Sequence, residues 1–158
     1  MADPNLTRQA ALEQGFSYLE RTLAALPEGA GLSLKSDNPQ LAELPRETRA
    51  VPCSDRAEHT SENFPSDVRV GYWLVGVPEG KDPQYFDKIV QTWASWGWKT
   101  VEKPDERQAT FIGGDNYGLS MVNAEKGTGS ISVEVATPCI KPENLGDEVV
   151  PPTVVKRP

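Results

Sequence analysis

Two stretches of the chain place apolar residues at the period of an α-helix. In residues 6–26, leucine and phenylalanine recur at every third or fourth position, which forms one apolar stripe. Residues 83–96 show the same period after Asp82, a candidate N-cap, and Pro83 and Gly97 suit the two ends of a helix. The pattern therefore predicts two amphipathic helices, each packed through one face.

Other stretches alternate between apolar and polar residues, as β-strands do. The strongest is 68–77, which is apolar on both of its faces and therefore suits a central strand. Shorter strands are expected at 31–36, 98–103, 109–113, 117–125 and 130–139. Because helices and strands are partly segregated along the chain, we expect an α+β fold. It would be a mainly antiparallel sheet of about five strands, with two helices packed on one face.

Two segments lack any clear period. Residues 37–67 contain four prolines and predict a long loop, a feature that is often functional in a domain of this size. The C-terminal residues are also rich in proline. We therefore expect a single α+β domain over residues 1–148 and a flexible tail over residues 149–158.

Three of the four tryptophans lie within six residues, in "WASWGW" at 93–98. This cluster could form an aromatic platform for a ligand or the buried end of a helix. Trp93 and Trp96 share one arc of the predicted helix with Phe86 and Ile89, at about 100° per residue. The shared arc favours the buried helix end, and the ligand platform remains the alternative.

The face of the predicted sheet opposite the core is polar and built from small side chains around one aromatic residue. Antiparallel sheets commonly leave one face in water, so a merely solvated surface is one interpretation. A binding or assembly surface is the other, because a tryptophan among small residues is a plausible hot spot. The candidate binding residues are Trp73, Arg69, Lys35, Ser132 and Glu134.

Composition excludes several classes of function. The formal net charge of −7 argues against nucleic acid as a partner, because phosphate binding needs a basic surface. No apolar stretch is long enough to span a membrane.

The glycines of "FIGGDNYG" fit a tight turn rather than a phosphate-binding loop, and no cofactor or metal motif is present. The single histidine, His59, could serve a hydrolase site only with the nearby acids Asp55 and Glu58.

The chain has two cysteines, Cys53 and Cys139, and neither has a second cysteine or a histidine at metal-ligand spacing. A disulfide between them is the favoured interpretation, and two separate free thiols are the alternative. A disulfide would indicate an oxidising compartment outside the cytoplasm.

The order of these features resembles the soluble domain of mycobacterial and related actinobacterial cell-envelope lipoproteins of the LppA type. The resemblance covers about residues 5–140. It depends on "PCSD" at 52–55, the helix "YFDKIVQTWASWGW", the segment "GDNYG" at 114–118 and a last strand that leads into Cys139. It implies a secreted domain with an intramolecular disulfide, held at the membrane by an acylated N-terminal cysteine. This chain departs from that pattern because it has no such cysteine near its start, so the anchor would be absent from this chain.

These observations predict a non-catalytic, extracytoplasmic lipoprotein domain attached to the cell membrane, without a cofactor. Its expected partner is a protein or an envelope glycan or lipid, and not nucleic acid. Two alternatives are a structural accessory subunit of a membrane-associated complex and a hydrolase with a site around His59.

Overall fold

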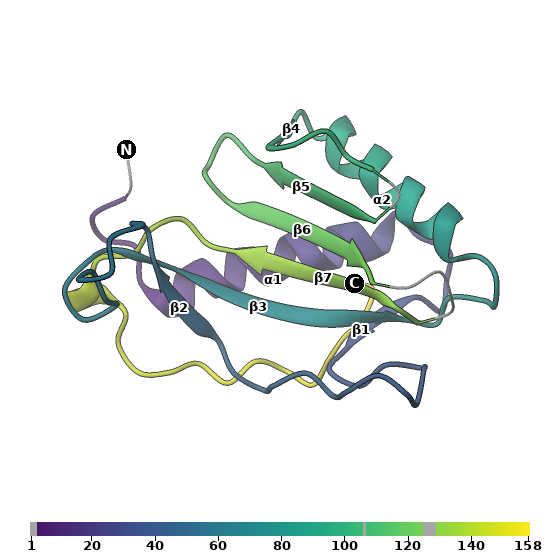
Figure 1. Cartoon of the computed structure of the whole chain (residues 1–158), viewed down its shortest axis with the longest axis horizontal. Coiled ribbons are helices and arrows are strands. Elements are labelled where there is room, and N and C mark those ends of the chain that lie inside the picture. The colour runs from purple at the N-terminus through teal and green to yellow at the C-terminus, as the bar shows by residue number, and fades with distance from the viewer. Residues whose placement is uncertain (1–2, 106, 125–128) are drawn as a thin grey trace.

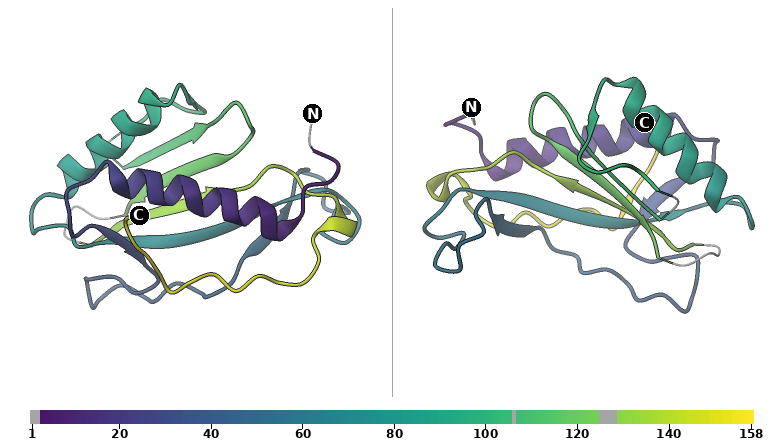
Figure 2. Two further views of the ribbon diagram at one scale, coloured as in Figure 1. Left: turned by 180° about the vertical axis from the view of Figure 1, so that it is seen from behind. Right: turned by 45° about the horizontal axis from the view of Figure 1, so that its top comes forward.

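The protein is a two-layer α+β domain in which two helices cover one face of a sheet. The structure is a computed structural model that describes residues 3–105, 107–124 and 129–158. Helix α1 spans Arg8–Ala24 and helix α2 spans Asp82–Ser95. Seen from behind, both helices lie on the same side of the sheet (Figure 2). The predicted fold class and the placement of both helices are therefore confirmed.

Within the described residues the sheet has eight strands, and every neighbouring pair is antiparallel (Figure 1). The prediction of about five strands was too low. The strand order is β4-β5-β6-β7-β3-β1-β8, and β2 also pairs with β3. The strands are β1 (Gly31–Ser33), β2 (Arg49–Pro52), β3 (Ser66–Val75), β4 (Lys99–Thr100), β5 (Gln108–Ile112), β6 (Gly118–Asn123), β7 (Ile131–Ala136) and β8 (Val154–Val155).

Strand β3 shows how the sequence divides the sheet into a core face and an open face. Its buried and partly exposed residues alternate without interruption over ten positions. The buried set, Val68, Val70, Tyr72 and Leu74, faces the helices, and each of these residues is at most 2% exposed. The intervening residues point to the other face, which neither α1 nor α2 covers. The strand is central in the sheet, as predicted, but the helices cover only one of its two faces.

The ends of the second helix differ slightly from the prediction. Gly97 follows α2 in the left-handed conformation, with φ of +80°, as its position after the last helical turn requires. At the other end, Lys81 is the N-cap and Asp82 is already the first residue of the helix. Asp82 does not cap the helix but is buried, where its carboxylate accepts the Gly129 N–H at 3.2 Å. Its role is to fasten the segment before β7 to the start of α2.

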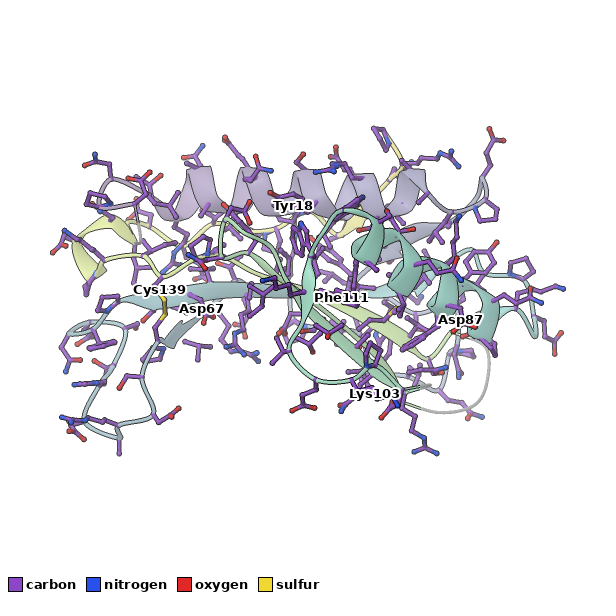
Figure 3. The ribbon with its side chains drawn as sticks, turned by 90° about the horizontal axis from the view of Figure 1, so that it is seen from above. Tyr18, Asp67, Asp87, Lys103, Phe111 and Cys139 are labelled. Carbon is purple, nitrogen blue, oxygen red and sulfur yellow. A yellow bond between two sulfur atoms is a disulfide. The ribbon has the colours of Figure 1, made fainter. Side chains whose placement is uncertain are left out.

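A disulfide joins Cys53 to Cys139, as predicted, with 6.3 Å between the two Cα atoms. It connects the residue after β2 to the segment that follows β7, and in Figure 3 it lies near Asp67 at one end of the sheet. The bridge holds the base of the hairpin between β2 and β3. A disulfide is compatible with an extracytoplasmic location.

The last ten residues, predicted to form a flexible tail, pack against the domain. Val155 is buried and pairs with Leu32 of β1, and the side chain of Pro151 is buried as well. The Tyr72 hydroxyl donates to the Pro152 carbonyl at 2.8 Å. Arg157 donates to the carbonyl oxygen of Leu26 at 2.7 Å, close to the end of α1. These contacts extend the sheet beyond the predicted domain boundary.

Among the described residues, no helix combines the length and apolar composition needed to cross a membrane.

Candidate functional site

The open face of the sheet carries four of the five predicted binding residues. Arg69 and Trp73 point outward from β3, and Ser132 and Glu134 point outward from β7. The register places Trp73 opposite Ser132, and Glu134 opposite Gly71. The fifth residue, Lys35, is exposed and lies two positions after the end of β1. The sequence alternation therefore placed these side chains on the correct face.

One side of β3 is shared by two short strands that do not meet. Strand β2 pairs with residues 66–69 of β3, and β1 pairs with residues 73–75. Gly71 lies at the middle of the interval between them. Within the described part of the chain, no residue pairs with Gly71 on that side. The sheet therefore has a gap one residue pair wide beside its central strand.

The hydrogen bonds of β3 show which way the Gly71 peptide groups point. Ser66 exchanges two backbone hydrogen bonds with Ile140, on the β7 side of the strand. On the same side, the Val68 carbonyl accepts the Thr137 N–H, and the Val68 N–H donates to the Thr137 hydroxyl. Successive residues of a strand direct their N–H and C=O groups to alternate sides. Even-numbered residues of β3 thus bond toward β7, and the N–H and C=O of Gly71 point into the gap.

A cleft of about 130 Å³ opens over this gap. The residues that precede Arg49 do not pair with β3, because they bond to the C-terminal segment instead. The Thr48 hydroxyl donates to the Val149 carbonyl at 3.2 Å, and Arg46 Nε donates to the Pro151 carbonyl at 3.0 Å. The lining residues are Leu44, Pro45, Glu47, Arg49, Arg69, Val70, Gly71 and Glu134.

Two hydrogen bonds hold the loop between β1 and β2 beside the cleft. The indole N–H of Trp73 donates to the Ala42 carbonyl at 2.9 Å, and the Leu44 N–H donates to the Leu34 carbonyl at 2.8 Å. Trp73 is therefore a partly buried anchor for the loop. Leu44 and Pro45 form the apolar wall of the cleft as a result.

The charges in the cleft balance one another. The lining contains two arginines and two glutamates, and Arg49 Nη2 lies 3.5 Å from Glu134 Oε2. Arg69 contacts both carboxylate oxygens of Asp67, at 2.7 and 3.2 Å. This hydrogen-bonded pair raises the pKa of the Arg69 guanidinium. Each arginine thus already has an acidic partner, and the lining itself carries equal numbers of positive and negative side chains.

Sequence reasoning found only part of this site. Arg69 and Glu134 line the cleft, whereas Ser132 lies beside Trp73 and Lys35 lies outside the lining. It missed Arg49 because β2 lies within the segment that has no apolar period. The preferred pairing of Cys53 with Cys139 was a usable signal, because it places the residues just before Cys53 near the strand that leads to Cys139.

His59 lies in the hairpin between β2 and β3. Its Nδ1 atom is 2.6 Å from Ser54 Oγ, and its ring stacks on Phe64 with 4.2 Å between centroids. Asp55 and Glu58, the acids considered for a hydrolase site, are exposed. Among the described residues neither forms an ion pair with His59. These contacts stabilise the hairpin and do not assemble a histidine with an acid partner.

The tryptophan cluster lies at the other end of the domain. Trp93 is fully buried, and its indole N–H donates to the Thr22 hydroxyl at 3.0 Å. Its ring also meets Phe111 edge to face, at 5.7 Å between centroids. The prediction that the buried helix end, and not a ligand platform, explains this tryptophan is confirmed.

Trp96 and Trp98 are partly exposed, but they contact other aromatic and charged side chains of the domain. Both pack against Tyr18 of α1, which projects toward the sheet in Figure 3. The Arg21 guanidinium lies 4.4 Å from the centre of the Trp96 ring. The Tyr18 hydroxyl donates to Asp115, and burial, together with this bond, raises the pKa of Tyr18 to about 12. The cluster thus fastens α1 to the turn between β5 and β6.

No set of histidine, cysteine and acidic side chains in the described residues is grouped closely enough to hold a metal ion. Comparison of the chain with family models, with curated proteins and with solved structures finds no match.

Proposed function

We propose that this chain is a non-catalytic, extracytoplasmic binding domain that recognises an envelope partner through the cleft beside Gly71. The observation that carries the proposal is the gap in the sheet. Backbone donors and acceptors in the interior of a sheet are normally paired, and those of Gly71 are free to bond to a ligand. The partner would be a protein, a glycan or a lipid of the cell envelope.

Two related features support the compartment. The disulfide between Cys53 and Cys139 is compatible with an oxidising environment. The arrangement of sequence features also resembles the LppA-type lipoproteins described above. On this proposal the domain is attached to the membrane through a lipid anchor.

Recognition fits the cleft better than chemistry does. Three of the four charged side chains that line it have an ionic partner within the protein: Arg49 pairs with Glu134, and Arg69 pairs with Asp67. Paired charges of this kind orient polar ligands and confer specificity. A general acid or base would instead need a carboxyl or imidazole group directed at a reacting atom.

An NMR titration tests the proposal. Isotope-labelled protein is mixed in turn with the protein, glycan and lipid fractions of a bacterial cell envelope. We expect one fraction to shift the amide signals of Gly71, Arg49 and Glu134, and we expect Trp73→Ala, which releases the loop, to weaken that response. Lys88→Ala is the control, because Lys88 is exposed on the helical layer. Shifts confined to the helices, or an unchanged response in Trp73→Ala, would exclude the cleft as the binding site.

A structural role as an accessory subunit is the second candidate, and one observation favours it. Val101, Ile112 and Val122 are 44–54% exposed, and Ile112 and Val122 belong to β5 and β6 of the same sheet. Large exposed apolar side chains often mark protein interfaces, although single ones are common. On this alternative, Ile112→Ser would weaken association with the partner subunit, while Gly71→Ala would not.

A further inference from the structure

We infer that the cleft binds an uncharged, extended peptide segment, which forms a single backbone bridge with Gly71. This inference rests on the proposed function, because it names the chemical class of the partner at the same cleft. It follows from three properties of the cleft: the direction of its free backbone groups, its shape and its charge.

The free N–H and C=O of Gly71 belong to the same residue and point the same way into the gap. A residue of an antiparallel partner strand offers one C=O and one N–H at the spacing that such a pair requires. Adding an extended peptide to a sheet in this way is a recurrent mode of peptide recognition. Here β2 and β1 limit the gap on either side, so only about one residue of the ligand can pair.

The shape of the cleft admits a backbone at this point because residue 71 has no side chain. A Cβ atom at Gly71 would lie 3.9 Å from the Val133 carbonyl oxygen and 4.0 Å from Glu134 Oε2. Those are ordinary contact distances, so an alanine would fit the fold but would occupy the floor of the cleft. The apolar wall of Leu44 and Pro45 then offers contact for a small apolar side chain of the ligand.

Charge and ring contacts distinguish a peptide from the other envelope ligands. A phosphate or carboxylate head group would have to compete with Glu134 for Arg49 and with Asp67 for Arg69. Among the described residues no aromatic ring lines the cleft, and Trp73 instead binds the loop, so this lining offers no ring face for a sugar to stack on. A neutral amide backbone satisfies the donor and the acceptor without displacing either ion pair.

Amide hydrogen exchange tests the free backbone directly. In the free protein the Gly71 N–H should exchange much faster than the N–H groups of Val70 and Tyr72, which bond toward β7. The probe is N-acetyl-trialanine amide at millimolar concentration. We expect it to shift the Gly71 amide signal and to slow its exchange at least several-fold. The same peptide with its central amide methylated should lose this effect, because it lacks the N–H that would bond to the Gly71 carbonyl.

A pair of glycine variants provides the matched comparison. Gly71→Ala should weaken binding of the peptide at least tenfold, because the methyl group occupies the floor of the cleft. Gly118→Ala is the control, because Gly118 belongs to β6 on the same sheet and an added Cβ would meet only ordinary contacts there, the nearest at 3.7 Å. Equal weakening by both substitutions would overturn the inference.

Two further probes separate this inference from the proposed function. Chitotriose represents a glycan, and inorganic phosphate represents an anionic head group. If either one shifts the Gly71 signal while the peptide does not, the peptide class is wrong and the cleft remains a binding site. If neither these probes nor any envelope fraction affects the residues of the cleft, both proposals are wrong.

Discussion

Removal of the disulfide should destabilise the domain strongly. The bridge joins residues 86 positions apart, and closing a loop of that length reduces the entropy of the unfolded chain by the equivalent of about 4–5 kcal/mol. Domains of this size are stable by about 5–15 kcal/mol in total. The bridge therefore accounts for a large share of the expected stability.

The test compares oxidised wild-type protein with the double variant Cys53→Ala and Cys139→Ala in urea, followed by far-ultraviolet circular dichroism. We expect a loss of about 4–5 kcal/mol and a fall in melting temperature of roughly 10–20 °C. Reduced wild-type protein is the control, because it lacks the bridge but keeps both cysteine side chains. Its free energy of unfolding should match that of the double variant. Mass spectrometry before and after reduction should differ by two hydrogen atoms.

Two results would refute this reasoning. A double variant within about 1 kcal/mol of the oxidised protein would show that the loop-entropy account fails here. A mass that does not change on reduction would show that the bridge does not form. The second result would also remove the physical argument for an extracytoplasmic compartment.

Three further predictions concern buried groups. Trp93→Ala should cost about 3–5 kcal/mol and Trp96→Ala distinctly less, because only the first side chain is fully buried; equal losses in urea unfolding would contradict this. Burial raises the pKa of Asp82 from its usual value of 3.8, so the folded state holds this proton more tightly than the unfolded chain does. The stability of the wild type therefore falls as the pH rises above 3.8. Relative to Asp82→Asn, the wild type should therefore lose stability as the pH rises above that value, and a constant difference would count against the argument. Asp115→Asn should lower the pKa of Tyr18 from about 12, as measured by tyrosinate absorbance, and an unchanged titration would disprove the coupling.

The layers of the fold could be predicted from local pattern because each buried segment carries its own period. The apolar stripes of both helices and the alternation of β3 are properties of consecutive residues, so they identify the core face and, by subtraction, the open face with Arg69 and Trp73. Strands β2 and β8 lack such a signal. They have four and two residues and lie among prolines, and only their pairing with β3 and β1 defines them.

The cleft could not be predicted from the sequence, for the same reason. Its lining combines β3 with β2 and with the loop before it, and the position of that loop depends on bonds to the C-terminal segment, such as Thr48 to Val149. Glu134 was found because it lies on a regular strand. Arg49 was missed because its strand partner, Arg69, and its ion-pair partner, Glu134, are both distant from it in the chain.

The gap beside Gly71 is difficult to explain as a device for stability. A ten-residue central strand could be paired along its whole length, yet here two strands of three and four residues share one side and leave the middle open. A glycine inside a strand also costs about 0.5–1 kcal/mol relative to alanine, and an alanine would fit at this position without a clash. Both features weaken the sheet at one point, and both expose the same peptide groups to the cleft. A structural purpose would require at least one of them to strengthen the fold, whereas a binding purpose requires both.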